Sequence, residues 1–192
     1  VRNSLNLPTD KKLLLFSSMK ITDPKKGIDY LVEACKLIQK NHPDFCNSLG
    51  VVVVGKESQQ YADLFPFPIY CLNYVGNEKD LVNIYNAVDL FVTPSLQENL
   101  PNTIVEAMSC GVPCVGFNIG GIPQMIDHLH NGYVAQYKSS EDLANGICWS
   151  LNEGDYASLS EEARRKAVET YSEQNVAMKY IKIYNHITGE NA

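Results

Sequence analysis

Two glutamates near a predicted helix start are the side chains whose types and spacing suggest chemistry. Seven residues separate Glu98 from Glu106, and a helix is expected to begin near Asn102, between them. The first amides of a helix have no partner within it, and the helix dipole attracts anions to this end, so the N–H groups of Asn102, Thr103 and Ile104 could bind phosphate oxygens. A neighbouring glutamate could accept two hydrogen bonds from a vicinal diol such as that of a ribose.

A lysine-rich turn at residues 17–27 could complete such a site. Lys20, Lys25 and Lys26 follow the first predicted strand, and they would clamp a diphosphate if they faced the helix start at Asn102. A simpler interpretation of both features stays open. Lysines in a short turn are often a solvated surface, and Glu106 could do no more than stabilise its own helix start.

Short apolar segments alternate with amphipathic ones, and this pattern predicts the elements that must position these residues. Continuous apolar segments are typical of strands in a parallel sheet that is covered on both faces. We expect an α/β fold: one Rossmann-like, doubly wound parallel sheet with C-terminal helices, forming a single domain over residues 1–192. The expected strands are 13–16, 51–54, 69–75, 90–92, 114–117 and 133–135, and the expected helices are 26–40, 80–86, 103–110, 141–151, 156–170 and 173–187.

In such a sheet, ligands bind beyond the carboxyl ends of the strands. The site should therefore form from the loops 17–27, 55–58, 76–80, 93–103 and 117–122. The sequence lacks the patterns G-x-x-x-x-G-K-[ST] and G-x-S-x-G, and no G-x-G-x-x-G follows the first strand. A P-loop ATPase, an α/β-hydrolase and a standard dinucleotide oxidoreductase are therefore disfavoured.

Composition limits the partners. The 192 residues are 45% apolar and 20% charged, as in a globular protein, and the net charge of −6 argues against a nucleic-acid partner. No apolar run approaches the ~20 residues of a transmembrane helix. Six scattered cysteines, with no Asn-x-Ser/Thr sequon, favour reduced thiols in the cytoplasm, and their spacing predicts no metal site.

Five separated motifs carry a resemblance to a known family. The most distinctive is Pro94-Ser95-x-x-Glu98, followed after seven residues by Glu106-Ala-Met-x-Cys-Gly-x-Pro113. The others are Lys26-Gly27 through residue 34, Val75-Gly76, residues 81–94 with Tyr85 and Asp89, and Gly120-Gly121 through Gly132. In this order, over residues 10–187, the sequence resembles the C-terminal, nucleotide-binding half of GT-B glycosyltransferases in the large retaining family called GT4.

The resemblance implies an enzyme that transfers a hexose from a UDP- or GDP-sugar to a glycan or lipid-linked acceptor, with retention and without a cofactor. We expect no metal ion, because the helix dipole and the lysines would neutralise the phosphates and the sequence has no Asp-x-Asp. It implies catalytic roles for Glu98, at the donor sugar hydroxyls near the anomeric centre, and for Lys26, at the departing diphosphate. Glu106 would bind the ribose hydroxyls. The remaining donor-binding positions that it implies are Lys20, Gly55 with its neighbour Lys56, Val75, Gly76, Asn77, Asn99, Asn102, Thr103 and Ile104.

The sequence also departs from the family pattern. The family usually has Gly-Arg after the first strand, whereas this chain has Ser17-Ser-Met-Lys20, and a lysine cannot reproduce the bidentate fork of an arginine. The usual glycine-rich turn reads Asn99-Leu-Pro-Asn102, where Pro101 removes one amide donor, and Gln124 replaces a common acidic residue.

The family's other, N-terminal half binds the acceptor and is missing from this sequence. We therefore expect the chain alone to bind the nucleotide weakly and to transfer no sugar. In the full-length protein the N-terminal half is an expected partner, and a peripheral position at the inner membrane face would suit a lipid-linked acceptor. Two alternatives remain: a sugar-nucleotide epimerase of the same fold, which the spacing of the two glutamates disfavours, and a non-catalytic nucleotide-binding module, which the missing arginine favours.

The last predicted helix carries an apolar stripe after a predicted N-cap at Ser172. The stripe could pack on this domain or dock on material outside the chain. Its members are Val176, Tyr180, Ile183, Tyr184 and Ile187.

Overall fold

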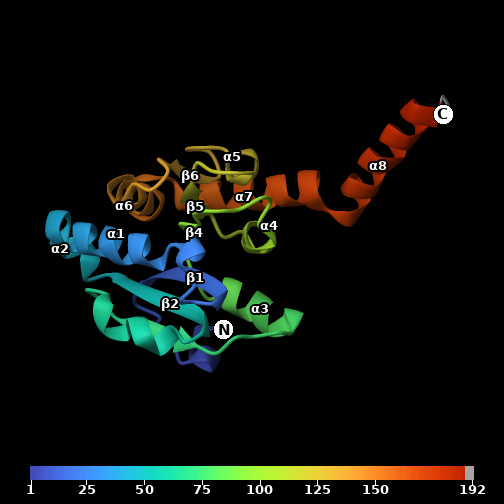
Figure 1. Ribbon diagram of the computed structural model, residues 1–192. Coiled ribbons are helices and arrows are strands. Elements are labelled where there is room, and N and C mark those ends of the chain that lie inside the picture. Colours follow the sequence, from blue (N-terminus) through green and yellow to red (C-terminus); the bar gives the residue numbers. More distant parts are fainter. Residues whose placement is uncertain (189–192) are drawn as a thin grey trace.

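The computed structural model describes residues 1–188, and its helices surround one six-stranded parallel sheet (Figure 1). The strand order is β3-β2-β1-β4-β5-β6. The predicted Rossmann-like α/β fold is therefore confirmed. The strands are β1 (Lys12–Lys20), β2 (Leu49–Lys56), β3 (Ile69–Leu72), β4 (Leu90–Thr93), β5 (Cys114–Phe117) and β6 (Gly132–Ala135).

The six long helices lie within a few residues of their predicted positions. Two one-turn helices and the 3₁₀ segments at 2–5, 24–26 and 58–64 were not predicted, and the helix expected at 141–151 continues as a π-helix over 149–153. The strand expected at 69–75 ends at Leu72, because pairing with β2 stops where Leu72 meets Val54. The helices are α1 (Ile28–Asn41), α2 (Pro43–Cys46), α3 (Glu78–Tyr85), α4 (Asn102–Ser109), α5 (Ile122–Met125), α6 (Ser140–Cys148), α7 (Tyr156–Tyr171) and α8 (Glu173–Thr188).

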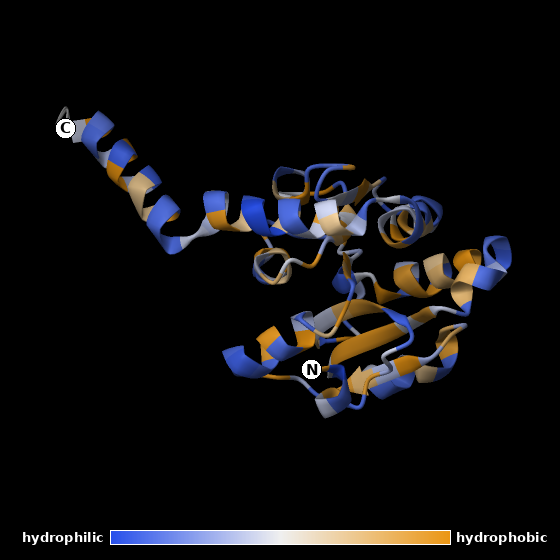
Figure 2. Cartoon of the chain, turned by 180° about the vertical axis from the view of Figure 1, so that it is seen from behind, coloured by the Kyte–Doolittle hydropathy of each residue, from blue (hydrophilic) through white to orange (hydrophobic). Residues whose placement is uncertain are grey.

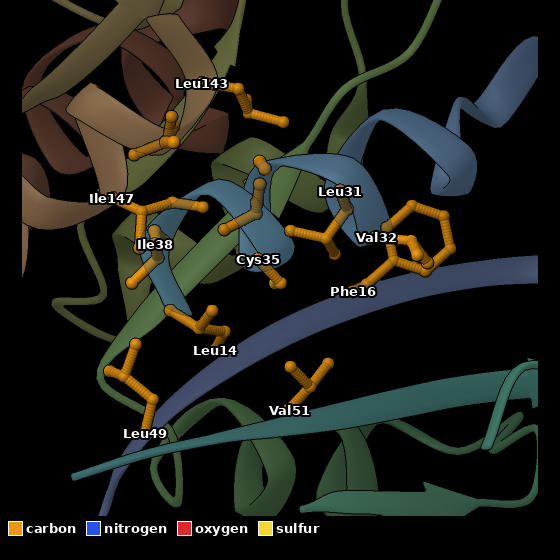
Figure 3. Packing of buried hydrophobic residues seen from close by; sticks show 14 of the residues in the cluster. Leu14, Phe16, Leu31, Val32, Cys35, Ile38, Leu49, Val51, Leu143 and Ile147 are labelled. Carbon is orange, nitrogen blue, oxygen red and sulfur yellow. The ribbon is translucent and has the colours of Figure 1, made fainter. Parts of the chain in front are cut away.

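Apolar side chains cover both faces of the sheet. Side chains alternate along a strand, so Leu14 and Phe16 pack on one face while Leu13 and Leu15 pack on the other. On the first face, α1 and α6 pack side by side on the sheet, and Figure 3 shows side chains from β1, β2 and both helices. Helices α3, α4 and α7 contribute to the opposite layer. A sheet buried on both faces leaves its strand ends as the place for a ligand.

Asp89 ties the N-terminal segment to the sheet. Its Oδ2 accepts hydrogen bonds from the Leu13 amide at 2.7 Å and from the Arg2 guanidinium at 2.6 Å. The same guanidinium also donates to the carbonyl oxygens of Ala87 and Lys11. The motif residue Asp89 thus has a structural role, at the start of β4.

We expect Asp89→Ala to destabilise the fold by about 2 kcal/mol, because it leaves a partly buried guanidinium and a strand amide without their acceptor. For a domain of this size that corresponds to a fall of about 4–8 °C in the melting temperature. Asp10→Ala, at an exposed loop position before β1, is the control and should change it little. Equal melting temperatures for the two variants would contradict this role of Asp89.

Helix α8 projects away from the sheet and its covering helices (Figure 1; Figure 2 shows apolar residues along it). Ser172 caps it as predicted, since its Oγ accepts from the Asn175 amide at 3.4 Å. None of the described residues of α8 is buried, and Ile187 is 74% exposed. The expectation that this stripe packs on its own domain is therefore wrong, whereas docking outside the chain stays open. Across residues 1–188, no helix has the length and apolar character to cross a bilayer.

Candidate functional site

The site forms where the chain leaves two neighbouring strands in different directions. β1 and β4 pair side by side, but β1 continues through α1 to β2 whereas β4 continues through α4 to β5. Their loops therefore diverge at the carboxyl edge, which is the topological switch point where ligands bind in open α/β sheets. Two adjoining clefts open there. They share residues 17–19 and Thr103 in their linings.

The first cleft, called the charged cleft, has a volume of about 330 Å³. Its charged lining residues are Lys20, Asp23, Lys26 and Glu98, and its hydroxyl groups include those of Thr93 and Ser95. The second, called the apolar cleft, has a volume of about 210 Å³. Its lining includes Val54, Tyr74, Val75, Leu81, Tyr85 and Glu106. One site thus combines a charged half and a mostly apolar half.

Lys26 and Glu98 meet in the charged cleft although 72 residues separate them. The Lys26 ammonium lies 2.6 Å from Glu98 Oε1, and their side chains are 35% and 15% exposed. Lys26 belongs to a 3₁₀ turn, and the Lys25 carbonyl of that turn accepts from the Leu96 amide at 2.7 Å. The next residue, Gly27, has φ +71°, and a Cβ there would lie 2.0 Å from the Pro94 carbonyl oxygen. The two loops can therefore touch only because glycine stands at position 27.

Two further glycines hold the Glu98 loop from its other side. Gly120 has φ +55°, and a Cβ there would lie 1.9 Å from the Glu98 carbonyl oxygen. The Gly121 amide donates to the Asn99 carbonyl at 2.6 Å. The Tyr137 hydroxyl donates to the Leu96 carbonyl at 3.2 Å. The backbone that carries Glu98 is thus held by loops that follow three different strands.

Glu106 lies on α4 and lines the apolar cleft. Its Oε2 accepts a hydrogen bond from the Tyr85 hydroxyl of α3 at 2.9 Å. Burial, followed by the charge of Glu106, raises the pKa of Tyr85 far above its ordinary value, so this hydroxyl stays protonated. The sequence analysis placed Tyr85 within a motif but gave it no role, because a contact between two helices leaves no local pattern.

The start of α4 differs in one respect from the expectation. No side chain among residues 1–188 caps this helix, and Pro101 stands at its N-cap position. However, the Ile104 amide donates to the Pro101 carbonyl at 3.1 Å, so the prediction that it is an unpaired donor was wrong. The tight first turn of the helix uses this amide. The Asn102 and Thr103 amides remain the predicted phosphate donors, and Thr103 lines both clefts.

The other predicted positions divide into two groups. Lys20 and Val75 line the charged and the apolar cleft, respectively. The second group lines neither cleft and consists of Gly55, Lys56, Gly76, Asn77 and Asn99. Gly55 instead packs against the Ser18 carbonyl, where a Cβ would lie 1.9 Å away, and Asn77 caps α3 by accepting from the Asp80 amide at 2.9 Å.

Sequence reasoning missed several residues that line the clefts: Met19, Tyr74, Thr93 and Ser95. Thr93 ends β4 and Ser95 lies in the loop after it, and their buried hydroxyl groups lie 3.3 Å apart. Both lie in the loop 93–103 that was expected at the site, and Ser95 was quoted within a motif but was given no role. Within residues 1–188, no three His, Cys, Asp or Glu side chains gather in a way that could hold a metal ion.

A parallel sheet with an uncapped helix start and paired charges at its switch point defines a Rossmann-like domain suited to a phosphorylated ligand. Residues 10–153 match the family described as Glycosyl transferases group 1. Since this match spans most of the chain, the chain belongs to the group 1 glycosyl transferases.

Relatives and solved structures agree with this assignment. The chain is 27% identical over 184 residues to N,N'-diacetylbacillosaminyl-diphospho-undecaprenol alpha-1,3-N-acetylgalactosaminyltransferase of Campylobacter jejuni, covering 95% of this chain and 47% of that protein. Sucrose-phosphate synthase from Thermosynechococcus elongatus has a similar fold, with a TM-score of 0.78, 21% identity, and coverage of 99% of this chain and 49% of the other. HepE from Anabaena, solved in complex with UDP-glucose, has a TM-score of 0.74 at 22% identity over 96% of this chain and 51% of its own. The chain thus spans about half the length of these proteins.

Proposed function

We propose that this chain is the donor-binding, C-terminal half of a glycosyltransferase that moves a hexose from a UDP- or GDP-sugar to a glycan or lipid-linked acceptor with retention. The observation that carries the proposal is the Lys26–Glu98 pair, 2.6 Å apart beside the uncapped start of α4. A cation, free helix amides and a carboxylate in one cleft suit a diphosphate joined to a polyhydroxylated ring.

In this proposal the charged cleft holds the diphosphate and the sugar. Lys26, with Lys20 near it, and the amides of Asn102 and Thr103 stabilise the negative charge that grows on the departing nucleoside diphosphate. When the donor binds, Lys26 exchanges Glu98 for a phosphate oxygen, and Glu98 becomes an acceptor for sugar hydroxyls. Because protein groups neutralise the leaving group, we propose that transfer needs no metal ion.

The apolar cleft then holds the nucleoside. Glu106 accepts hydrogen bonds from the ribose diol, and the apolar side chains Val54, Val75 and Leu81 cover the base and the ribose. The backbone at Val75, Gly76 and Asn77 remains our proposal for reading the base edge. Gly55 packs against β1, so in this proposal it shapes the end of β2 and does not contact the nucleotide.

The comparisons support a nucleotide-sugar donor and an acceptor attached to a lipid. HepE has been solved with UDP-glucose, and the Campylobacter relative is named for transfer to a diphospho-undecaprenol carrier. Both are about twice as long as this chain, so we propose an N-terminal, acceptor-binding half as its partner. For a lipid-linked acceptor, we propose a cytoplasmic enzyme that associates peripherally with the inner membrane face.

Isothermal titration of the chain with UDP, GDP and UMP in the presence of EDTA tests donor binding. We expect UDP or GDP to bind with a dissociation constant of about 0.1–1 mM, and UMP to bind more weakly than UDP because it lacks the second phosphate that Lys26 would meet. If the site is independent of metal, the dissociation constant should be the same with EDTA as without it. No heat with either diphosphate at millimolar concentration would contradict the proposal.

Transfer activity separates the chain from the full enzyme. We expect no sugar transfer to an added acceptor by this chain alone, because the acceptor-binding half is needed. Detectable transfer would overturn that part of the proposal. The absence of the family's arginine favours a second candidate, a non-catalytic nucleotide-binding module. Wild-type turnover in both full-length variants, Glu98→Ala and Lys26→Ala, would support that candidate instead.

A further inference from the structure

Tyr85 is a buried polar residue at the edge of the proposed nucleoside site. Its side chain is only 2% exposed, yet the residue lines the apolar cleft together with Glu106. Its ring packs edge-on against Phe91, with centroids 6.2 Å apart and an interplanar angle of 78°. A phenylalanine could make that packing contact equally well. The hydroxyl group must therefore be explained by its hydrogen bond to Glu106.

That hydrogen bond restricts a flexible carboxylate. A glutamate side chain on a helix surface has several rotamers, and a ligand must select one of them when it binds. The Tyr85 hydroxyl occupies one acceptor position on Oε2 of Glu106. An ionised carboxylate has about four such positions, so Oε1 and the rest of Oε2 stay available to a ligand. Because the pKa of Tyr85 is strongly raised, the hydroxyl keeps its proton and can donate it to Glu106.

We propose that Tyr85 is a positioning residue that holds the Glu106 carboxylate in the orientation needed to recognise both hydroxyls of a ribose, and so sets the preference for ribonucleotides over deoxyribonucleotides. This inference rests on the proposed function, in which Glu106 faces the ribose. It adds the selectivity of that subsite and a residue that acts on the ribose through Glu106. A carboxylate that is already held in place loses less conformational entropy when a ligand binds. The resulting increase in affinity is largest for a ligand with two adjacent hydroxyls.

The test compares UDP with 2′-deoxy-UDP by isothermal titration, with GDP and 2′-deoxy-GDP in their place if guanine is the base bound. We expect the wild-type chain to bind the ribonucleotide more tightly than the deoxyribonucleotide. Tyr85→Phe should reduce the ratio of the two affinities about fivefold, mainly by weakening the binding of the ribonucleotide. Glu106→Gln should reduce the same ratio, and adding Tyr85→Phe to it should change the ratio little, because the two residues act as one unit.

Tyr133→Phe is the matched control. The Tyr133 hydroxyl of β6 donates to the Asp142 carboxylate at 2.8 Å, so this variant also loses a tyrosine–carboxylate hydrogen bond, but it lines neither cleft. We expect its ribose preference to equal that of the wild type. A purely structural role for Tyr85 would lower the melting temperature and leave the ratio unchanged.

The outcomes separate the two proposals. If the wild type binds neither diphosphate, the proposed function fails and this inference fails with it. If the wild type binds but does not distinguish ribose from deoxyribose, or if folded Tyr85→Phe keeps the wild-type ratio, only the inference is overturned. Should Tyr85→Phe not fold, the Glu106→Gln ratio decides from the other partner of the hydrogen bond: a wild-type ratio in that variant overturns the inference.

Discussion

Replacing Lys26 with alanine should weaken UDP or GDP binding by about 10- to 100-fold. A charge-assisted hydrogen bond to a phosphate contributes about 1.5–3 kcal/mol, which corresponds to a loss of that size. The variant also leaves the Glu98 carboxylate, 15% exposed and without its cation, beside the place proposed for the phosphates. Isothermal titration at low and moderate ionic strength measures both effects, and the affinity of the variant should depend less on salt than that of the wild type.

Two further variants sharpen this prediction. Lys25→Ala removes the same charge from the same turn, but Lys25 lines neither cleft, so we expect an affinity within about twofold of the wild type. Glu98→Gln added to Lys26→Ala should recover part of the affinity, since it removes the repulsive carboxylate. Equal losses from Lys25→Ala and Lys26→Ala would mean that only the general charge of the turn matters. Wild-type affinity in Lys26→Ala would remove Lys26 from the phosphate site.

Gly120→Ala should produce the largest loss of stability among the variants considered. A side chain at φ +55° costs about 1–2 kcal/mol, and a Cβ 1.9 Å from the Glu98 carbonyl oxygen forces the backbone of the neighbouring loop to move. Overpacking of this kind adds about 1–3 kcal/mol. We expect a total near 3 kcal/mol, seen as a fall of about 6–12 °C in the melting temperature.

Gly76→Ala is the matched control for stability. Its added Cβ would meet only the Tyr74 ring, at 3.8 Å, which is an ordinary van der Waals distance. Its melting temperature should therefore stay within about 2 °C of the wild type. Hydrogen exchange provides a second measurement on folded Gly120→Ala, where faster exchange should concentrate in the Glu98 loop. Similar melting temperatures for the two variants would show that the loop adapts to the extra methyl group.

Much of the architecture could be predicted because its signals are local. Apolar segments such as Val51 to Val54 predicted buried strands, and the spacing of apolar residues predicted the long helices to within a few residues. The expectation that a site lies at the carboxyl ends of the strands also came from the alternation of strands and helices. Residue type and spacing indicated Glu98, Glu106 and the lysine-rich turn, and the resemblance singled out Lys26 within that turn. The structure brings Lys26 and Glu98 into contact.

What the sequence by itself determined is therefore the strands and the long helices, the likeness to a known family, and several residues that lie at one edge of the sheet. Only the tertiary structure decided which of them touch: Lys26 with Glu98, Tyr85 with Glu106, and Gly120 with the Glu98 backbone. It also decided that the Ile104 amide is used within its own turn and that the stripe of α8 is exposed. The physical reason is that periodicity and capping act over a few residues, whereas contacts between distant residues depend on how the elements pack. The pairing of β1 with β4 brings Lys26 to Glu98, and the pairing of β4 with β5 brings Gly120 to the Glu98 loop.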